Sequence, residues 1–253
     1  MELTILGSGT AVPSLRRGAA GYLVRVGSDL VVMDTGPGTL SRLLKAGVGH
    51  NEVTHLLYSH NHLDHTGELT SWLFASRIPA SARTGPLTIC GSAGFMQMLD
   101  SLDETYGHWI GTPGYSRNLV TLGGDAASHV DHDGWTLTAS AVRHIDSSLA
   151  YRITDAEGRS LVYSGDTDVC DELIALAHDA DLLLVEASFP DAQKVEGHLT
   201  PSEAGEIARR SGARRVVLTH FYPPCDEADM LGELRRTYDG EAFLAEDGMR
   251  LTV

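Results

Sequence analysis

Three histidines and one aspartate lie within the six residues His60-Asn61-His62-Leu63-Asp64-His65. The apolar run Val53–Tyr58 precedes them and predicts a buried strand that ends where this cluster begins. Side chains two residues apart on an extended segment point to the same side, so His60 and His62 can bind one metal ion. Where the chain then turns, Asp64 and His65 can face a second ion. The cluster therefore predicts a two-metal site at a strand end.

Three further residues each follow an apolar strand, so the fold can bring them to the same edge as the cluster. We expect the first ion to be bound by His60, His62 and His144, and the second by Asp64, His65 and His220. Asp166 can bridge the two ions because a carboxylate has two oxygens, and a hydroxide between the ions would fill the open positions. Asp34 ends an earlier strand. It could hold its own turn, but beside a metal cluster we expect it to orient the ligands.

The order of strands and helices predicts an α/β fold with two similar halves in a single domain, residues 1–253. Expected strands are 2–6, 21–26, 30–34, 53–58, 135–141, 150–154, 160–163, 182–186 and 216–219, and the segment 244–253 closes the fold. Expected helices are 40–46, 66–75, 172–177 and 201–211, the last with Thr200 as N-cap.

Composition and charge restrict the setting and the substrates. The chain has 19 Lys and Arg against 34 Asp and Glu, a formal net charge of -15, so its surface repels polyanions and long nucleic acid is disfavoured. Small anions remain compatible because two divalent cations would dominate the local potential. Cys90, Cys170 and Cys225 are few and far apart, which favours free thiols in a reducing compartment. We see no signal peptide or membrane span, and expect a cytoplasmic protein.

The HxHxDH motif and its later partners resemble the metallo-β-lactamase superfamily. The resemblance covers nearly the whole chain: the Asp34 loop, residues 60–65, His144, Gly165-Asp166-Thr167, His220 and the ending Glu246-Asp247-Gly248-Met249. It implies a four-layer αβ/βα sandwich with a dinuclear site at the edge between two sheets. It leaves the substrate open, because members of this superfamily hydrolyse lactams, thioesters, lactones and phosphodiesters, and some carry out redox chemistry.

Within the superfamily the chain is most similar to the ribonuclease Z-like and cyclic-nucleotide phosphodiesterase branch, through Glu186-Ala187-Ser188-Phe189 and Gly197-His198-Leu199-Thr200. This resemblance implies that His198 is a general acid or oxyanion partner and that Glu186 orients it; we count Asp64 with them as catalytic. Ribonuclease Z binds tRNA through a long basic arm between the third and fourth metal motifs. Only 22 positions (166 − 144) separate His144 from Asp166 here, so we do not expect tRNA as a substrate.

We therefore expect a metal-dependent hydrolase that cleaves small phosphodiesters, such as cyclic nucleotides or cyclic sugar phosphates, with a metal-bridging hydroxide. Zn²⁺ is the expected metal, with Mn²⁺ and Fe²⁺ open. One alternative is a lactone, carboxylic ester or thioester hydrolase in which Tyr163 or Tyr222 polarises the carbonyl. Another is a metal-binding protein without turnover. The family resemblance also allows a homodimer.

The region Gly107–Gly134 is the hardest to interpret. Its Gly, Asp and Ser content predicts a loop that could cover the active site, with His108, His129 and His132 in solvent. We expect pocket walls from residues 13–17, 107–115 and 221–224. Arg16 and Arg17 either contact a phosphate or lie on a solvated loop.

Overall fold

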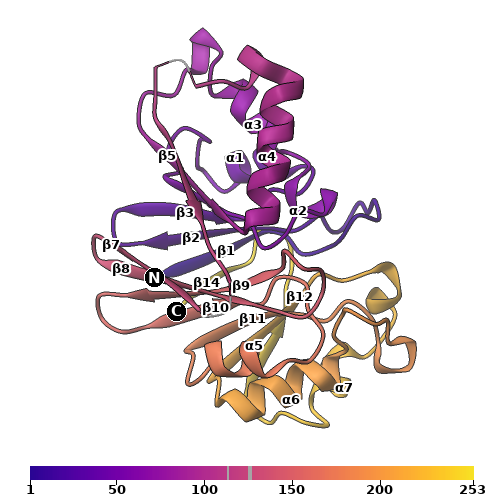
Figure 1. The fold of residues 1–253 in the computed structure, drawn as a ribbon. Helices are drawn as coiled ribbons and strands as arrows, with labels where there is room; N and C mark the ends of the chain where they lie inside the picture. The colour runs from indigo at the N-terminus through magenta and orange to yellow at the C-terminus, as the bar shows by residue number, and fades with distance from the viewer. Residues whose placement is uncertain (113, 125–126) are drawn as a thin grey trace.

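The computed structural model describes residues 1–112, 114–124 and 127–253, and it folds into two β-sheets packed face to face with helices on both outer sides (Figure 1). Within these residues each sheet has seven strands, in the orders β14-β1-β2-β3-β4-β5-β6 and β13-β12-β11-β10-β9-β8-β7. Helices α1, α3 and α4 cover the first sheet, and α5, α6 and α7 cover the second (Figure 1). The predicted four-layer α/β sandwich is confirmed.

The elements have the following bounds. The first sheet contains β1 (Glu2–Gly7), β2 (Gly21–Val26), β3 (Asp29–Met33), β4 (His55–Leu57), β5 (Leu87–Gly91), β6 (Arg117–Thr121) and β14 (Arg250–Thr252). The second contains β7 (Ser128–His132), β8 (Trp135–Ala141), β9 (Leu149–Asp155), β10 (Ser160–Tyr163), β11 (Leu182–Glu186), β12 (Arg215–Thr219) and β13 (Glu241–Leu244). The α-helices are α1 (Thr39–Lys45), α2 (Leu63–Thr66), α3 (Leu69–Ala75), α4 (Ala93–Tyr106), α5 (Asp171–Leu176), α6 (Pro201–Ser211) and α7 (Met230–Leu234). Short 3₁₀ helices are Pro79–Ser81, Gly107–Trp109, Asp191–Gln193 and Pro223–Asp226.

The two sheets share a plan that places the site. In each, neighbouring strands begin antiparallel, β1 to β3 and β7 to β10, and continue parallel, β3 to β6 and β10 to β13. Parallel strands end at the same edge, so the loops after β4, β10 and β12 meet there. The carboxyl-terminal β14 returns to pair with β1 of the first sheet. One buried core includes side chains from both sheets, which supports our proposal of a single domain over residues 1–253.

Local sequence explains the elements that the prediction placed well. Val216, Val217 and Leu218 of β12 are fully buried, as expected for a parallel strand covered on both faces. Helix α6 begins with a capping box between Thr200 and Glu203, and Gly212, in a left-handed conformation, follows its last residue as the C-cap. Its bounds, Pro201–Ser211, are those predicted.

The helix predicted over residues 66–75 is divided in two. Helix α2 begins at Leu63, inside the metal motif, and α3 begins at Leu69. The helical bonding is interrupted because the Glu68 amide donates to the Thr35 carbonyl, at 2.9 Å, instead of to the preceding turn. Because α2 spans only Leu63–Thr66, Asp64 and His65 lie on a single helical turn.

The predicted long loop over residues 107–134 is wrong where the structure describes it. The region contains the strands β6 and β7, one at an edge of each sheet; Pro113, Asp125 and Ala126 lie outside the described residues. His132 is not solvated: its ring stacks on Trp135 at 3.9 Å and lies 4.7 Å from His55, between ring centroids. His108 and His129 are exposed, as predicted. The turn-forming residues of this region concealed two short edge strands.

Two bulk expectations also have structural counterparts. The three cysteines are free thiols, with Cys90 and Cys225 buried. None of the helices in the described ranges has both the length and the apolar content to span a membrane.

Candidate metal centre

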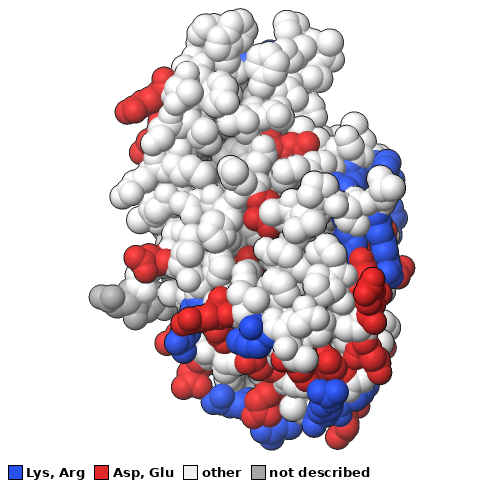
Figure 2. All heavy atoms as spheres, turned by 90° about the vertical axis from the view of Figure 1, so that its right-hand side faces the viewer, with Lys and Arg blue, Asp and Glu red and all other residues white. Residues whose placement is uncertain are grey.

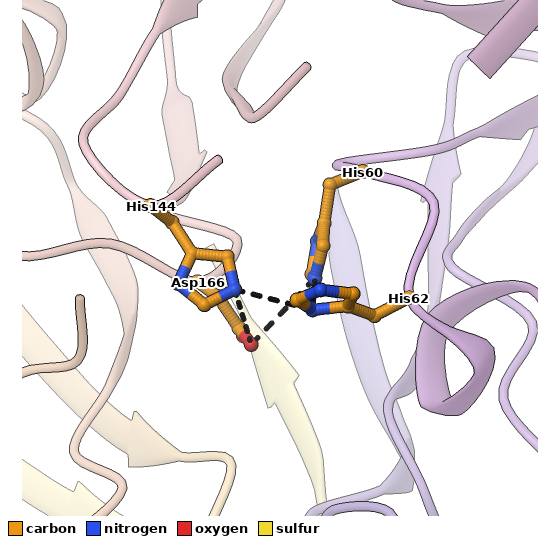
Figure 3. A group of neighbouring side chains, drawn as sticks. All are labelled: His60, His62, His144 and Asp166. Carbon is orange, nitrogen blue, oxygen red and sulfur yellow. Dashed lines mark hydrogen bonds and ion pairs between the residues drawn. The ribbon is translucent and has the colours of Figure 1, made fainter. Parts of the chain in front are cut away.

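The first group of candidate ligands lies where the loops after β4, β8 and β10 meet. In Figure 3, His60 and His62 point toward His144 and Asp166 from the opposite side of the sandwich. One donor atom from each of the four residues lies within 4.8 Å of the others. His62 Nδ1 is 3.0 Å from His60 Nε2 and 3.2 Å from His144 Nε2. Asp166 Oδ2 is 3.7 Å from His60 Nε2 and 3.9 Å from His144 Nε2.

The second group consists of Asp64, His65 and His220. His65 Nε2 and His220 Nε2 lie 3.2 Å apart, and Asp64 Oδ2 is 3.4 Å from His220 Nε2. The other oxygen of Asp166, Oδ1, lies 3.4 Å from His65 Nε2 and 3.5 Å from His220 Nε2. Asp166 therefore presents one oxygen to each group, the arrangement that a bridging ligand needs. The structure brings all seven predicted ligands together.

The donors fit divalent cations on two observations. First, Asp166 Oδ1 is buried and has no hydrogen-bond partner among the described residues, although a buried polar atom is normally paired. Second, the pKa of His60 is lowered by burial and by the nearby His65. Burial raises the pKa of Asp166, but His220 and His65 lower it more, so the net pKa of Asp166 is below its ordinary value. Neutral imidazoles and ionised carboxylates are the forms that bind metal. Burial lowers the pKa of His65, but the carboxylates of Asp166 and Asp34 raise it more. In the absence of metal, a proton on His65 therefore balances the negative charge of these carboxylates, which a bound metal ion would otherwise balance.

Asp34 lies directly behind this centre and is fully buried. Its Oδ2 accepts hydrogen bonds from His65 Nδ1 (2.8 Å), Ser59 Oγ (2.8 Å) and Tyr163 Oη (2.7 Å), and its Oδ1 accepts from the Ser59 amide (2.8 Å). Because His65 donates through Nδ1, its Nε2 is free to face the centre. The contacts support the predicted orienting role over a simple turn.

Two non-glycine residues of the site have left-handed backbones, Asp34 with φ 57° and His220 with φ 61°. Such residues cost free energy and persist where the surrounding structure fixes them. Asp34 is fixed by the four hydrogen bonds above. His220 is fixed because its neighbour Phe221 donates its amide to the Ser8 carbonyl at 3.0 Å.

His198 and Glu186 form a pair beside the ligand groups. His198 Nδ1 is 3.1 Å from Glu186 Oε1, and the His198 ring lies 4.8 Å from that of His144 and 5.9 Å from that of His220. Burial lowers the pKa of His198, but the hydrogen bond and charge of Glu186 raise it more, so the net pKa is above its ordinary value. The structure thus places Glu186 in contact with His198, and His198 beside both ligand groups.

Sequence reasoning missed the residues that hold this arrangement. Asp168 accepts from the Gly197 amide at 3.0 Å and from Lys194 Nζ at 2.9 Å, while His144 Nδ1 donates to the Gly197 carbonyl at 2.8 Å. These bonds tie the loop before His198 to a candidate ligand. A second carboxylate two residues after Asp166 was the available signal. Ser59, which bonds to Asp34, gave no such signal, because isolated serines are common in loops.

Tyr163 and Arg17 are more deeply buried than the sequence suggested. Tyr163 is buried and donates to Asp34, so it cannot polarise a substrate carbonyl; Tyr222, stacked on Phe189, is only partly buried. Arg17 is also buried, and it donates to Ser8 Oγ, the Ala245 carbonyl and Asp226. It is not solvated, because it connects the loop to the carboxyl-terminal segment, and it also lines a cavity that Asp64 lines.

The expected pocket walls are partly in place. A cavity of about 440 Å³ next to the centre is lined by Pro13, Ser14, Leu63 and Asp64 among others. Residues 107–115 lie elsewhere where the structure describes them: Trp109 packs on Phe74 of α3, 6.1 Å between ring centroids. This segment covers α3 instead of the candidate site.

The fold and the site define a hydrolase of the metallo-β-lactamase type. Residues 30–221 match the family described as the beta-lactamase superfamily domain, and the chain belongs to that superfamily. It is similar to a ribonuclease Z of Mycobacterium sp. (strain KMS), with 30% identity over 275 residues that cover 100% of this chain and 96% of the relative. The predicted resemblance to ribonuclease Z is confirmed.

Two solved structures also match this chain over nearly its whole length. Human tRNase Z, short form, is 26% identical, with a TM-score of 0.81 and coverage of 100% of this chain and 99% of that one. The metallo-beta-lactamase fold protein YhfI from Bacillus subtilis is 24% identical, with a TM-score of 0.84 and coverage of 99% and 98%, and shows the fold alone.

Proposed function

We propose that the chain is a dinuclear metal-dependent phosphodiesterase that acts on small phosphodiesters. The observation that carries this proposal is the position of Asp166 between two groups of histidines, with one oxygen toward each. The proposed ligands are His60, His62, His144, Asp166, Asp64, His65 and His220. When bound, two divalent ions supply Lewis acidity and an activated water for attack on phosphorus. We propose Zn²⁺ because histidine nitrogen dominates the ligand set.

The protein's own groups account for the remaining chemistry. His198 gives its Nδ1 hydrogen to Glu186, so Nε2 is the atom that can donate a proton. As water adds to phosphorus and the ester P–O bond breaks, the leaving oxygen takes that proton. The raised pKa of His198 keeps the imidazole protonated at higher pH, which suits a general acid. Asp64 is proposed as a ligand that also positions His220, from which it lies 3.4 Å.

The preference for small substrates rests on charge and on chain length. On the face shown in Figure 2, Lys and Arg gather at one edge and in the lower part, with Asp and Glu among them. Arg16 and Arg42 are paired with Asp226 and Asp247, at 3.1 and 3.0 Å, so carboxylates offset their charge. In the described structure, the β9–β10 hairpin occupies the interval between His144 and Asp166. The similarity to ribonuclease Z favours RNA instead, so RNA belongs in the test.

The test is a substrate panel on fully metallated protein: bis(p-nitrophenyl) phosphate, cyclic nucleotides, lactones and a tRNA precursor. We expect hydrolysis of the small phosphodiesters. Hydrolysis of lactones alone, cleavage of the tRNA precursor alone, or no hydrolysis by protein holding both ions would each reject the proposal. A His198→Ala variant should keep its metal and lose turnover, whereas an exposed control, His178→Ala, should keep both.

A lactone or ester hydrolase is the second candidate, because Tyr222 lies 6.0 Å from His220 and 6.2 Å from His198, between ring centroids. Tyr222→Phe should then lower lactone turnover and leave metal content unchanged. A homodimer and a cytoplasmic location stay predictions from the sequence.

A further inference from the structure

Ser188 connects the candidate general acid with the second ligand group. It follows β11 by two residues and is fully buried. Its Oγ lies 2.5 Å from Glu186 Oε2, 2.9 Å from His220 Nδ1 and 3.3 Å from His198 Nδ1. One hydroxyl therefore contacts a carboxylate and two imidazoles.

The directions of these hydrogen bonds follow from what each group can donate. A carboxylate only accepts, so the single hydrogen of Ser188 goes to Glu186. The serine oxygen can then only accept, which requires His220 to carry its hydrogen on Nδ1. In that tautomer Nε2 has the free lone pair, and His220 Nε2 is the atom that faces Asp64 and Asp166. The tautomer that this hydroxyl imposes is the one that a metal ligand needs.

Glu186 extends the same network toward Asp166. Its Oε1 accepts from His198 Nδ1 at 3.1 Å and from the backbone amide of Thr167 at 2.8 Å. Thr167 is the residue after Asp166, the proposed bridge. Because Ser188 bonds Oε2, the carboxylate has a fixed orientation that keeps Oε1 toward His198 and Thr167.

We propose that Ser188 is a positioning residue: its hydroxyl fixes the metal-binding tautomer of His220 and holds the Glu186 carboxylate against His198. The expected effect on turnover rests on the proposed function, whereas the expected effect on metal affinity rests only on the candidate ligands. It predicts that loss of one buried hydroxyl weakens both metal binding and proton donation.

The experiment compares Ser188→Ala, Ser188→Cys and Ser188→Thr. Zn²⁺ affinity is measured by titration against a chromophoric chelator, and kcat and KM are measured with bis(p-nitrophenyl) phosphate. In the Ala and Cys variants we expect 10- to 100-fold weaker binding of one of the two ions, roughly the cost of losing an outer hydrogen bond to a metal ligand. We expect at least about a 10-fold lower kcat, with KM unchanged. The Thr variant retains a hydroxyl and should recover both.

Ser211→Ala is the matched control, because it removes another buried serine hydroxyl, whose bond goes to the Ala208 carbonyl. It should leave both readouts unchanged. The Cys variant keeps nearly the volume of serine, so it remains informative if the Ala variant folds poorly in a thermal melt. The inference is overturned if the Cys variant binds both ions with wild-type affinity, or if the Thr variant is as impaired as the Cys variant. If the wild-type protein hydrolyses no phosphodiester, the proposed function fails, and the metal titration still decides the role of Ser188.

Discussion

Removal of the Asp34 carboxylate should weaken both the fold and the metal centre. Four donors, the Ser59 amide and hydroxyl, His65 Nδ1 and Tyr163 Oη, bond to this carboxylate at 2.7 to 2.8 Å, and all are buried. An unsatisfied buried donor costs about 1–3 kcal/mol. We therefore expect Asp34→Ala to lower the free energy of unfolding by about 4 kcal/mol or more.

The assay is guanidinium unfolding of chelator-stripped protein, followed by Zn²⁺ titration of the folded fraction. Because His65 would lose the bond that orients it, we expect metal affinity to fall by roughly 10- to 100-fold. Tyr163→Phe is the control. It removes one donor and leaves Asp34 bonded to His65, so it should cost about 1 kcal/mol and spare metal affinity. An Asp34→Ala protein with wild-type stability or wild-type metal affinity would refute the reasoning.

Three other predictions concern different parts of the molecule. Glu186→Gln removes the charge that raises the pKa of His198, so the alkaline limb of the kcat–pH profile should move to lower pH; an unchanged limb would remove His198 from the role of acid. Burial lowers the pKa of His55 from 6.5 to about 4. The contribution of neutral His55 to the free energy of unfolding is therefore fully present above pH 6.5 and is lost as pH falls toward 4. Between pH 6.5 and 4 the free energy of unfolding of the metal-free protein should fall by about 3 kcal/mol more than that of His55→Phe. Parallel curves of unfolding free energy against pH for the two proteins would contradict this prediction. A Cβ at Gly36 would lie 2.0 Å from the Asp64 carbonyl oxygen, so Gly36→Ala should lower metal affinity and the melting temperature. A Cβ at Gly85 would meet no atom of the described residues within 4 Å, so Gly85→Ala should change neither.

The sequence identified the parts of this fold whose signal is local. Residues 216–218 are apolar, as expected for a strand covered on both faces, and the helix at 201–211 carries its own capping box. The seven candidate ligands could be found because each comes soon after a predicted strand and is a metal-binding residue type at that position. Edge strands such as β6 and β7 are short and partly exposed, so turn residues dominated their composition.

Contacts between distant segments could not be predicted in the same way. The sequence allowed Arg17 to be solvated, yet its bond to the Ala245 carbonyl joins residues 228 positions apart and buries it. Ser188 lies in a segment that the sequence singled out for Glu186 alone. Its importance appears only when β11 and β12 lie side by side and bring His220 within hydrogen-bonding distance.

Metal stoichiometry tests the central claim most directly. Protein purified without chelator and dialysed against Zn²⁺ should contain two ions per chain by elemental analysis, because the two ligand groups share Asp166. Asp166→Asn should lose both ions, whereas replacement of the exposed Asp171 by Asn should lose neither. A wild-type protein that binds no ion, or an Asp166→Asn variant that retains two, would contradict the account.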